Sequence, residues 1–213
     1  MGGARYASHL AMNLPLYFAF AWFVWVASIT PGPNCSLALA IGLHHGVAKV
    51  WKHALGIILG VGTLMLLGLW GTLDLLLAYP LAAKTLKFFG IAYLLYLGWS
   101  FFRAGDAKEG DNAIPSVASP KIYQSALMQI TNPKAWLLIT GTLGAYQGLA
   151  ESYWLQAGLI LGTFAICVVA AVYIWAWLGQ SIRQWLATGQ RTKYFNWVLG
   201  LSLVLTALWL VFQ

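Results

Sequence analysis

The sequence predicts an all-α integral membrane protein, a bundle of six transmembrane helices built from two inverted-topology three-helix repeats with broken first helices. Three observations lead to this fold class. Of the 213 residues, 61% are hydrophobic and only 8% are charged, with a mean hydropathy of +0.74, whereas a soluble domain carries about a quarter of its residues charged. Long uncharged runs recur along the chain, and two of them contain a proline motif. A spanning helix takes ~20 apolar residues, so the chain has room for about six.

Uncharged runs delimit the six expected spans. In the first repeat, residues 1–105, they lie at about 14–43, 54–79 and 81–102. The polar segment that follows, 106–120, is expected to be a cytoplasmic loop between the halves. In the second repeat, residues 121–213, the spans lie at about 122–146, 153–180 and 194–212. The first apolar run is longer than a signal peptide, which predicts that it is retained as a span.

The distribution of basic residues predicts the orientation. The connections after the first, third and fifth spans hold eight Lys and Arg residues, whereas the opposite side holds three. The basic side of a membrane protein faces the cytoplasm. We therefore expect both termini in the periplasm. The formal charge of +7 comes from scattered single residues that form no basic face, so no nucleic-acid partner is expected.

A weak internal repeat supports the division into two halves. The segment ITPGPN at 29–34 and the segment ITNPK at 130–134 place a proline-broken polar core 101 residues apart. GIILG at 56–60 recurs as GLILG at 158–162, an offset of 102 residues. Three spans per half would give the halves opposite orientations, as in many secondary transporters. The repeated glycines, expected to be helix-packing positions, are Gly56, Gly60, Gly158 and Gly162.

The two proline motifs are the predicted substrate path. Proline removes a backbone donor and breaks a helix, and unpaired backbone groups at membrane depth must face protein or a water-filled cavity. The alternative is a pair of kinks that only shape packing. Paired broken helices favour a substrate site at the repeat interface. The candidate residues are Thr30, Pro31, Gly32, Pro33, Asn34, Thr131, Asn132, Pro133 and Lys134.

Lys134 is the one charge that falls well inside an expected span. A buried ammonium needs a carbonyl, a water cavity or an anion, and a substrate carboxylate would suit it, together with the amide ends of the broken helices. Alternatively, Pro133 begins the fourth span as its first helical residue, and Lys134 then lies at the cytoplasmic interface. Both positions remain open at this point.

Other polar residues are weaker candidates. Asp74, late in the second span, is a candidate for proton or ion coupling, although an interfacial aspartate is the simpler interpretation. His44, His45 and His53 are placed in the cytoplasmic connection among lysines, so no metal site is expected. Cys35 and Cys167 lie in apolar runs and are expected to pack as small hydrophobes. The chain lacks Walker, zinc-protease and nucleophile-elbow motifs, so we expect neither an ATP-driven pump nor an enzyme, and no cofactor.

Three motifs resemble those of the LysE/RhtB amino-acid exporter family. They are TPGPN at 30–34, AYLLYLG at 92–98 and TNPKA at 131–135, in the family's order and spacing. The resemblance implies a bacterial inner-membrane exporter of amino acids or close derivatives, driven by the proton gradient, with the two broken helices lining the path. Many members carry an aspartate directly after the second glycine of the first GIILG-type motif, where this chain has Val61. Because the aspartate is absent at this position, we expect neutral amino acids as substrates more than cationic ones.

These observations give a leading function and two alternatives. The leading hypothesis is a secondary transporter of amino acids, with a small-molecule substrate and surrounding lipid as its partners. Divalent cation efflux is the first alternative, but it needs intramembrane acids or histidines that are nearly absent. A membrane-embedded protein without transport activity is the second. The sequence names neither the amino acid nor the coupling ion, and it leaves a homo-oligomer open.

Overall fold

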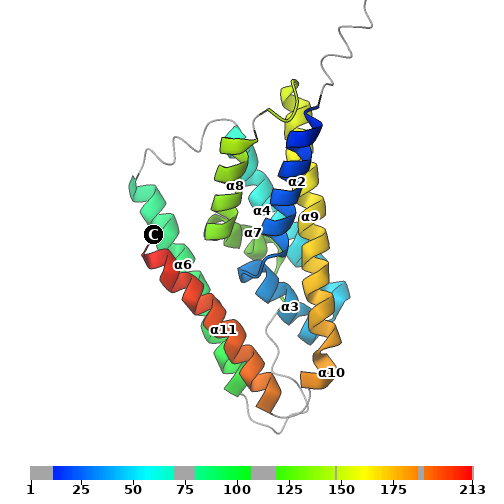
Figure 1. Ribbon diagram of the computed structural model, residues 1–213. Helices are drawn as coiled ribbons and strands as arrows, with labels where there is room; N and C mark the ends of the chain where they lie inside the picture. Colours follow the sequence, from blue (N-terminus) through cyan, green and yellow to red (C-terminus); the bar gives the residue numbers. More distant parts are fainter. Residues whose placement is uncertain (1–11, 70–79, 107–118, 147, 187–189, 213) are drawn as a thin grey trace, which may run out of the picture.

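The protein is described by a computed structural model that covers residues 12–69, 80–106, 119–146, 148–186 and 190–212. Within these ranges the chain is helical, with one short 3-10 helix and a single isolated bridge between Met12 and Ala150. The helices run alongside one another as a bundle (Figure 1). This agrees with the all-α class that the composition predicts.

The first half contains a broken helix followed by two continuous ones. Helix α2 spans Leu14–Ile29 and α3 spans Pro33–His45, and their axes differ by 56° at the break. The 3-10 helix η1 (Val47–Lys49) leads into α4, Trp51–Leu69. Helix α6 then spans Pro80–Asp106. The expected second span continued to residue 79, and its last part lies outside the described residues.

The second half repeats this order. Helix α7 spans Ile122–Ile130 and α8 spans Pro133–Ala145, so the chain is again broken at the proline motif. Helix α9 covers Tyr153–Ser181, a short α10 covers Arg183–Leu186, and α11 covers Gln190–Val211. In the described ranges, each expected apolar segment overlaps a helix, and the segments that contain the proline motifs overlap a pair of helices.

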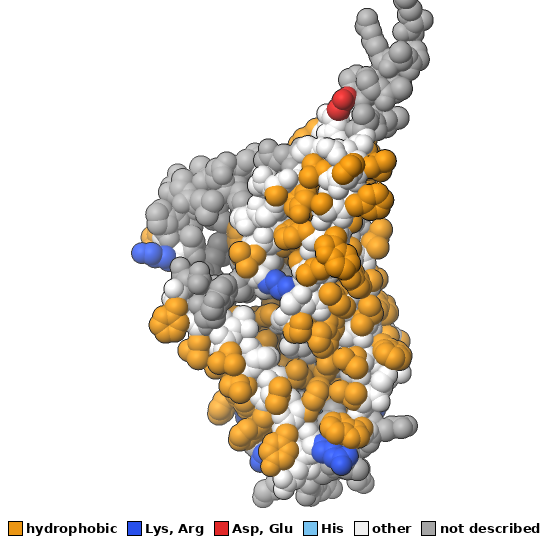
Figure 2. All heavy atoms as spheres, in the orientation of Figure 1, with side chains coloured by type: hydrophobic (Ala, Val, Ile, Leu, Met, Phe, Trp, Pro, Cys, Tyr) orange, Lys and Arg blue, Asp and Glu red, His pale blue; other side chains and the backbone are white. Residues whose placement is uncertain are grey.

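Length and composition identify some of these units as membrane spans. In the described part of the chain, two continuous helical stretches are long and apolar enough to cross a bilayer, Val47–Gly68 and Tyr153–Ser181, and the bent pair α2 and α3 would make a third. Figure 2 shows hydrophobic side chains spread along the length of the face in view, with few charged ones among them. Large exposed residues such as Trp22, Trp154 and Ile166 are 68%, 78% and 71% accessible. A surface this apolar suits lipid and not water, so the protein is a multi-pass membrane protein.

Helix α9 is the centre of the packing, because it contacts α2, α3 and α4. Helix α4 in turn packs against α7 and α8. Helices α6 and α11 pack chiefly on each other and form a separate pair at one side of the bundle (Figure 1). The buried core follows α9, with Phe164, Val168 and Val172 facing inward.

Glycines set the closest helix contacts. A Cβ atom on Gly42 of α3 would lie 1.9 Å from the Ala176 carbonyl oxygen of α9, and one on Gly179 would lie 2.1 Å from the Leu39 oxygen. Gly98 of α6 and Gly200 of α11 approach each other in the same way, with a Cβ on either lying 3.0 or 2.8 Å from the other's carbonyl oxygen. No side chain fits at such distances, so these crossings require glycine.

The glycines predicted from the repeat behave in two ways. A Cβ on Gly56 or Gly60 would lie 2.5 Å from a carbonyl oxygen of α7, so both are helix-packing positions. Gly158 and Gly162 have no described atom within 4 Å of such a Cβ, and both lie on an exposed face of α9. For this second pair the predicted close packing is wrong: the contacts of α9 are made instead through Gly179, near its other end.

Candidate functional site

The first helix break frees backbone carbonyls, and specific side chains bind them. Helix α2 ends at Ile29, and α3 begins at Pro33, which has no backbone N–H to offer. The Trp175 indole of α9 donates to the Ile29 carbonyl oxygen at 3.0 Å. The Cys35 thiol lies 3.4 Å from the Ser28 carbonyl oxygen and 3.3 Å from that of Thr30. Carbonyl groups at the end of a helix need hydrogen-bond partners of this kind. The helix break is therefore stabilised by side chains of α3 and α9.

The second break is satisfied in a related way. Helix α7 ends at Ile130, whose carbonyl oxygen accepts from the Trp136 indole at 2.7 Å. The Asn132 side chain caps α8 by accepting from the Lys134 backbone N–H at 3.1 Å. The two carbonyls bound by indoles, at Ile29 and Ile130, are 101 residues apart, which is the offset of the repeat.

Lys134 connects the two breaks. It lies in the first turn of α8 and is half-buried, and its ammonium donates a hydrogen bond to the Thr30 carbonyl oxygen at the end of α2. The structure therefore supplies the carbonyl partner that a buried ammonium requires. Its neighbour across the break is Gly32, where a Cβ would lie 3.4 Å from the Lys134 Cδ.

Amide side chains hold the two broken helices together. The Asn34 amide of α3 donates to the Gln129 Oε1 of α7 at 3.0 Å, and the Gln129 amide donates back to the Asn34 Oδ1 at 3.1 Å. Gln129 also donates to the Ser125 carbonyl oxygen at 2.8 Å and accepts from Asn132 at 3.3 Å. Gln129 and Asn132 are almost fully buried, at 0% and 2% accessible. A fully satisfied buried network of this kind fixes the geometry of the surrounding helices.

His53 belongs to this network, which corrects its predicted place in a cytoplasmic connection. It lies inside α4 and is 0% accessible. One ring nitrogen, Nδ1, is 2.8 Å from the Ser125 hydroxyl, and the other, Nε2, is 3.1 Å from the Asn34 carbonyl oxygen. A carbonyl only accepts, so Nε2 carries the proton and donates. His53 thus ties α4 to both α3 and α7.

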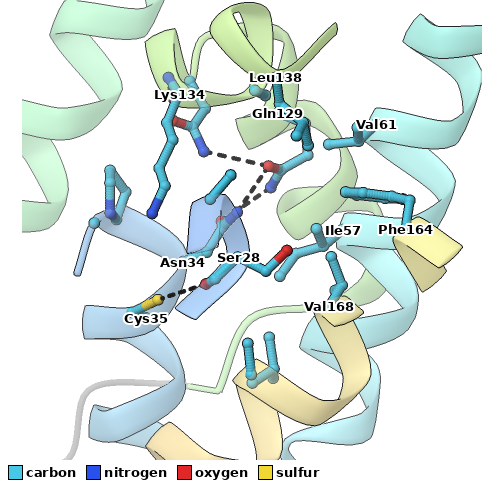
Figure 3. A pocket seen from close by; sticks show the side chains of 17 residues that line it. Ser28, Asn34, Cys35, Ile57, Val61, Gln129, Lys134, Leu138, Phe164 and Val168 are labelled. Carbon is cyan, nitrogen blue, oxygen red and sulfur yellow. Dashed lines mark hydrogen bonds between the residues drawn. The ribbon is translucent and has the colours of Figure 1, made fainter. Parts of the chain in front are cut away.

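These elements line a partly open cavity between the two breaks, of about 40 Å³ (Figure 3). Its polar wall carries Asn34, Gln129, Asn132 and the Lys134 side chain. Ser28 and Cys35 also line it, and the remaining wall is apolar and comes mainly from α4, α8 and α9, with Ile57, Val61, Ala135, Leu138, Phe164, Val168, Ala171 and Val172. No Asp or Glu is among the described residues that line it.

The predicted path residues are brought together, with different roles. Gly32, Pro33, Asn34, Asn132 and Lys134 line the cavity. Thr30 and Thr131 lie at the two helix breaks, and the Thr30 carbonyl oxygen accepts the hydrogen bond from Lys134. Pro31, which follows Thr30, is exposed, and Pro133 is the first residue of α8. Asp74 lies outside the described residues. Among the described residues no group of three His, Cys, Asp or Glu side chains is placed to hold a metal ion.

Some lining residues had no signal in the sequence. Ser28 and Gln129 each lie two residues before a proline motif, and nothing in the sequence indicates that their side chains reach the cavity until the helices are known to break there. The apolar wall from α9 begins at Phe164, 30 residues after Lys134, so its place beside the proline motifs depends on packing alone.

Comparison with known proteins places this site in a family. The profile of the LysE type translocator family matches residues 25–213, a range that contains both helix breaks and every residue that lines the cavity. The chain belongs to the LysE type translocator family. This LysE type translocator is 27% identical over 206 residues to the leucine efflux protein of Enterobacter sp., covering 93% of this chain and 95% of that one.

Other relatives carry related names. The chain is 28% identical over 203 residues to the cysteine/O-acetylserine efflux protein of Escherichia coli, with 92% and 97% of the two chains covered. It is 25% identical over 191 residues to the homoserine/homoserine lactone efflux protein of Salmonella typhimurium, with 89% and 92% covered. No solved structure matches this LysE type translocator.

Proposed function

We propose that this LysE type translocator is a secondary transporter that exports small neutral amino acids across the bacterial inner membrane, and that the cavity between the helix breaks is its substrate site. The relatives named as leucine, cysteine/O-acetylserine and homoserine efflux proteins support amino-acid export. Because the family is one of translocators, the activity is transport and not an enzymatic reaction. The observation that carries the proposal is the cavity itself, with one lysine and no described acid in its wall.

Lys134 is the residue that we propose binds the carboxylate group of the substrate. Its ammonium donates a hydrogen bond to the Thr30 carbonyl oxygen, a neutral acceptor. A substrate carboxylate in place of that carbonyl would form a stronger, charge-assisted hydrogen bond. The N-terminal ends of α3 and α8 also face the cavity, and helix N-termini favour negative charge. A cationic substrate side chain would find no acid among the described lining residues. The same reasoning disfavours divalent cation efflux, which would bring a metal ion toward an ammonium.

The proposed architecture is six spans in two inverted repeats, with both termini in the periplasm. Helix α2 packs on α9 as its counterpart α7 packs on α4, and the third helices of the two halves, α6 and α11, pack on each other. Gly98 and Gly200, which make that last crossing, are 102 residues apart. Exchange of equivalent helices across a two-fold axis would produce these pairings. Transport would then follow from one half rocking against the other about the cavity.

Proton coupling is the further part of the proposal. The position of the common family acid is Val61, which is 2% accessible and lies in the apolar wall. A proton would therefore have to bind elsewhere, and Asp74 is the acid we propose for it.

The carboxylate role is tested by ligand binding to purified protein, since a ligand raises the thermal stability of the state that binds it. We expect Lys134→Ala to weaken binding of a neutral amino acid by about ten- to a hundredfold, as befits a charged hydrogen bond. The methyl ester of the same amino acid, which lacks the carboxylate, should bind weakly to both the wild type and Lys134→Ala. Lys52→Ala, which removes an exposed lysine of α4 outside the cavity, is the control. Unchanged affinity in Lys134→Ala would show that another group binds the carboxylate.

A further inference from the structure

Ser28 places a hydroxyl in the cavity wall without a protein partner. It lies near the end of α2, two residues before the motif that breaks the helix, and it lines the cavity. Its Oγ atom is buried and makes no hydrogen bond in the described structure. Buried polar atoms in folded proteins are almost always hydrogen-bonded, so an exception inside a cavity points to a ligand or water that would bind it.

A serine hydroxyl inside a helix can donate to the backbone carbonyl four residues earlier. The Ser28 hydroxyl does not make this hydrogen bond. Elsewhere in the protein, helical hydroxyls donate to the carbonyl four residues earlier, as Thr63 does to Leu59 at 2.7 Å, Ser100 to Tyr96 at 2.9 Å and Thr140 to Trp136 at 2.9 Å. This back-bonding is the usual way in which Ser and Thr are satisfied inside a helix. Ser28 is turned away from that arrangement and into the cavity.

The surroundings of the hydroxyl define which part of a ligand would meet it. In Figure 3 the Ser28 hydroxyl lies on the Ile57 side of the cavity, away from the tip of Lys134. Ile57, Val61, Phe164 and Val168 make up the wall there. If an amino acid binds with its carboxylate on Lys134, its side chain extends into this apolar region. Ser28 is the described hydroxyl in that region with no partner of its own.

We propose that Ser28 is a specificity-determining residue, whose hydroxyl binds a hydrogen-bonding atom on the side chain of the exported amino acid. This inference rests on the proposed function. It assigns the substrate class as small neutral amino acids whose short side chain carries a hydroxyl, a thiol or a comparable polar group. A purely aliphatic side chain of the same size would leave the Ser28 hydroxyl unpaired, which a binding site penalises.

The test compares isosteric ligand pairs that differ by a hydroxyl in place of a methyl group, serine with 2-aminobutyrate and homoserine with norvaline. Affinities are measured by calorimetry on the purified full-length protein. We expect the wild type to prefer the hydroxyl member of a pair by roughly tenfold, the worth of one neutral hydrogen bond. In Ser28→Ala this ratio should fall to about one or reverse, while binding of the aliphatic member is retained.

Two control variants separate the possible failures. Ser36→Ala removes a buried serine of α3 that does not line the cavity, and it should keep the wild-type ratio. Lys134→Ala should weaken both members of a pair alike and leave their ratio unchanged. A wild type without preference, or a Ser28→Ala variant that keeps the preference, overturns the role of Ser28 while the proposed function stands. If no amino acid of either kind binds the wild type, the proposed function fails and this inference fails with it.

Discussion

At the scale of single residues, the site depends on polar groups that satisfy one another in an apolar surrounding. Asn34, Gln129 and His53 each have partners on another helix. A hydrogen bond gains little on average, but removing one partner leaves the other buried and unsatisfied at a cost of about 1–3 kcal/mol. Substitutions in this network should therefore be strongly coupled.

The amide pair offers a direct measurement of that coupling. We expect Asn34→Ala and Gln129→Ala each to destabilise the protein, and the double variant to lose less than the sum, with an interaction energy of about 0.5–3 kcal/mol. Unfolding in detergent gives the three free energies. Combining Asn34→Ala with Gln190→Ala, an exposed residue at the start of α11, should give additive effects. Additivity in the Asn34 and Gln129 pair as well would show that the two amides do not depend on each other.

His53 provides a second prediction at this scale. His53→Ala leaves the Ser125 hydroxyl and the Asn34 carbonyl without the ring that they contact, and each loss costs on the order of 1–3 kcal/mol. The neighbouring Lys52→Ala removes an exposed side chain and should change stability by less than about 0.5 kcal/mol. Thermal melting of the two variants compares them. Equal melting temperatures would mean that His53 contributes no structural bonds.

At the scale of helices, close backbone approach decides which elements pack. The crossing of α3 with α9 needs glycine at 42 and 179, and the crossing of α4 with α7 needs glycine at 56 and 60. In lipid, apolar surface alone does not drive helices together, so close packing at small residues carries much of the association. These crossings hold α3 and α7, the helices that carry Asn34 and Gln129, against the bundle.

Two alanine substitutions of glycine should therefore have opposite effects. Gly42→Ala would place its methyl 1.9 Å from the Ala176 carbonyl oxygen, so α3 and α9 must move apart at a cost of about 1–3 kcal/mol or more. Gly158→Ala meets no described atom within 4 Å and should stabilise α9 by up to about 1 kcal/mol through helix propensity. Both are read as melting temperatures in one detergent. A stable Gly42→Ala variant would contradict the close crossing.

At the scale of the whole molecule, the proposed orientation rests on the distribution of charge. Figure 2 shows basic side chains at the lower end of the bundle, where α3 and α9 end in Figure 1. In the sequence, Lys49 ends η1, Lys52 lies in the first turn of α4 and Arg183 begins α10. An excess of basic residues on one side sets the cytoplasmic face.

Reporter fusions test this orientation. Alkaline phosphatase, active only in the periplasm, should be active when fused after Phe212 and inactive when fused near residue 110. A green fluorescent reporter should give the reverse pattern. Phosphatase activity at both positions would contradict the three spans proposed between residue 110 and the C-terminus, and activity only near residue 110 would invert the proposed topology.

The sequence alone determined the features that depend on local chemistry. Apolar runs located the helices, because each spanning segment must satisfy its own backbone in lipid. Prolines located the two breaks for a similar reason, since Pro33 and Pro133 lack the donor that would continue the preceding helix. The same two motifs indicate Asn34, Asn132 and Lys134 as candidate site residues, and in the structure all three line one cavity.

Only the tertiary structure decided which distant residues meet at those breaks. His53 looked like a residue of a basic connection, and its burial between Asn34 and Ser125 depends on how α4 packs against α3 and α7. Gly158 and Gly162 matched a packing motif but lie on an open face of α9. Ser28, two residues before the motif, became a candidate because packing turned its hydroxyl into the cavity. Helical periodicity and proline chemistry act over a few residues, whereas the choice of partners depends on the shape of the whole bundle.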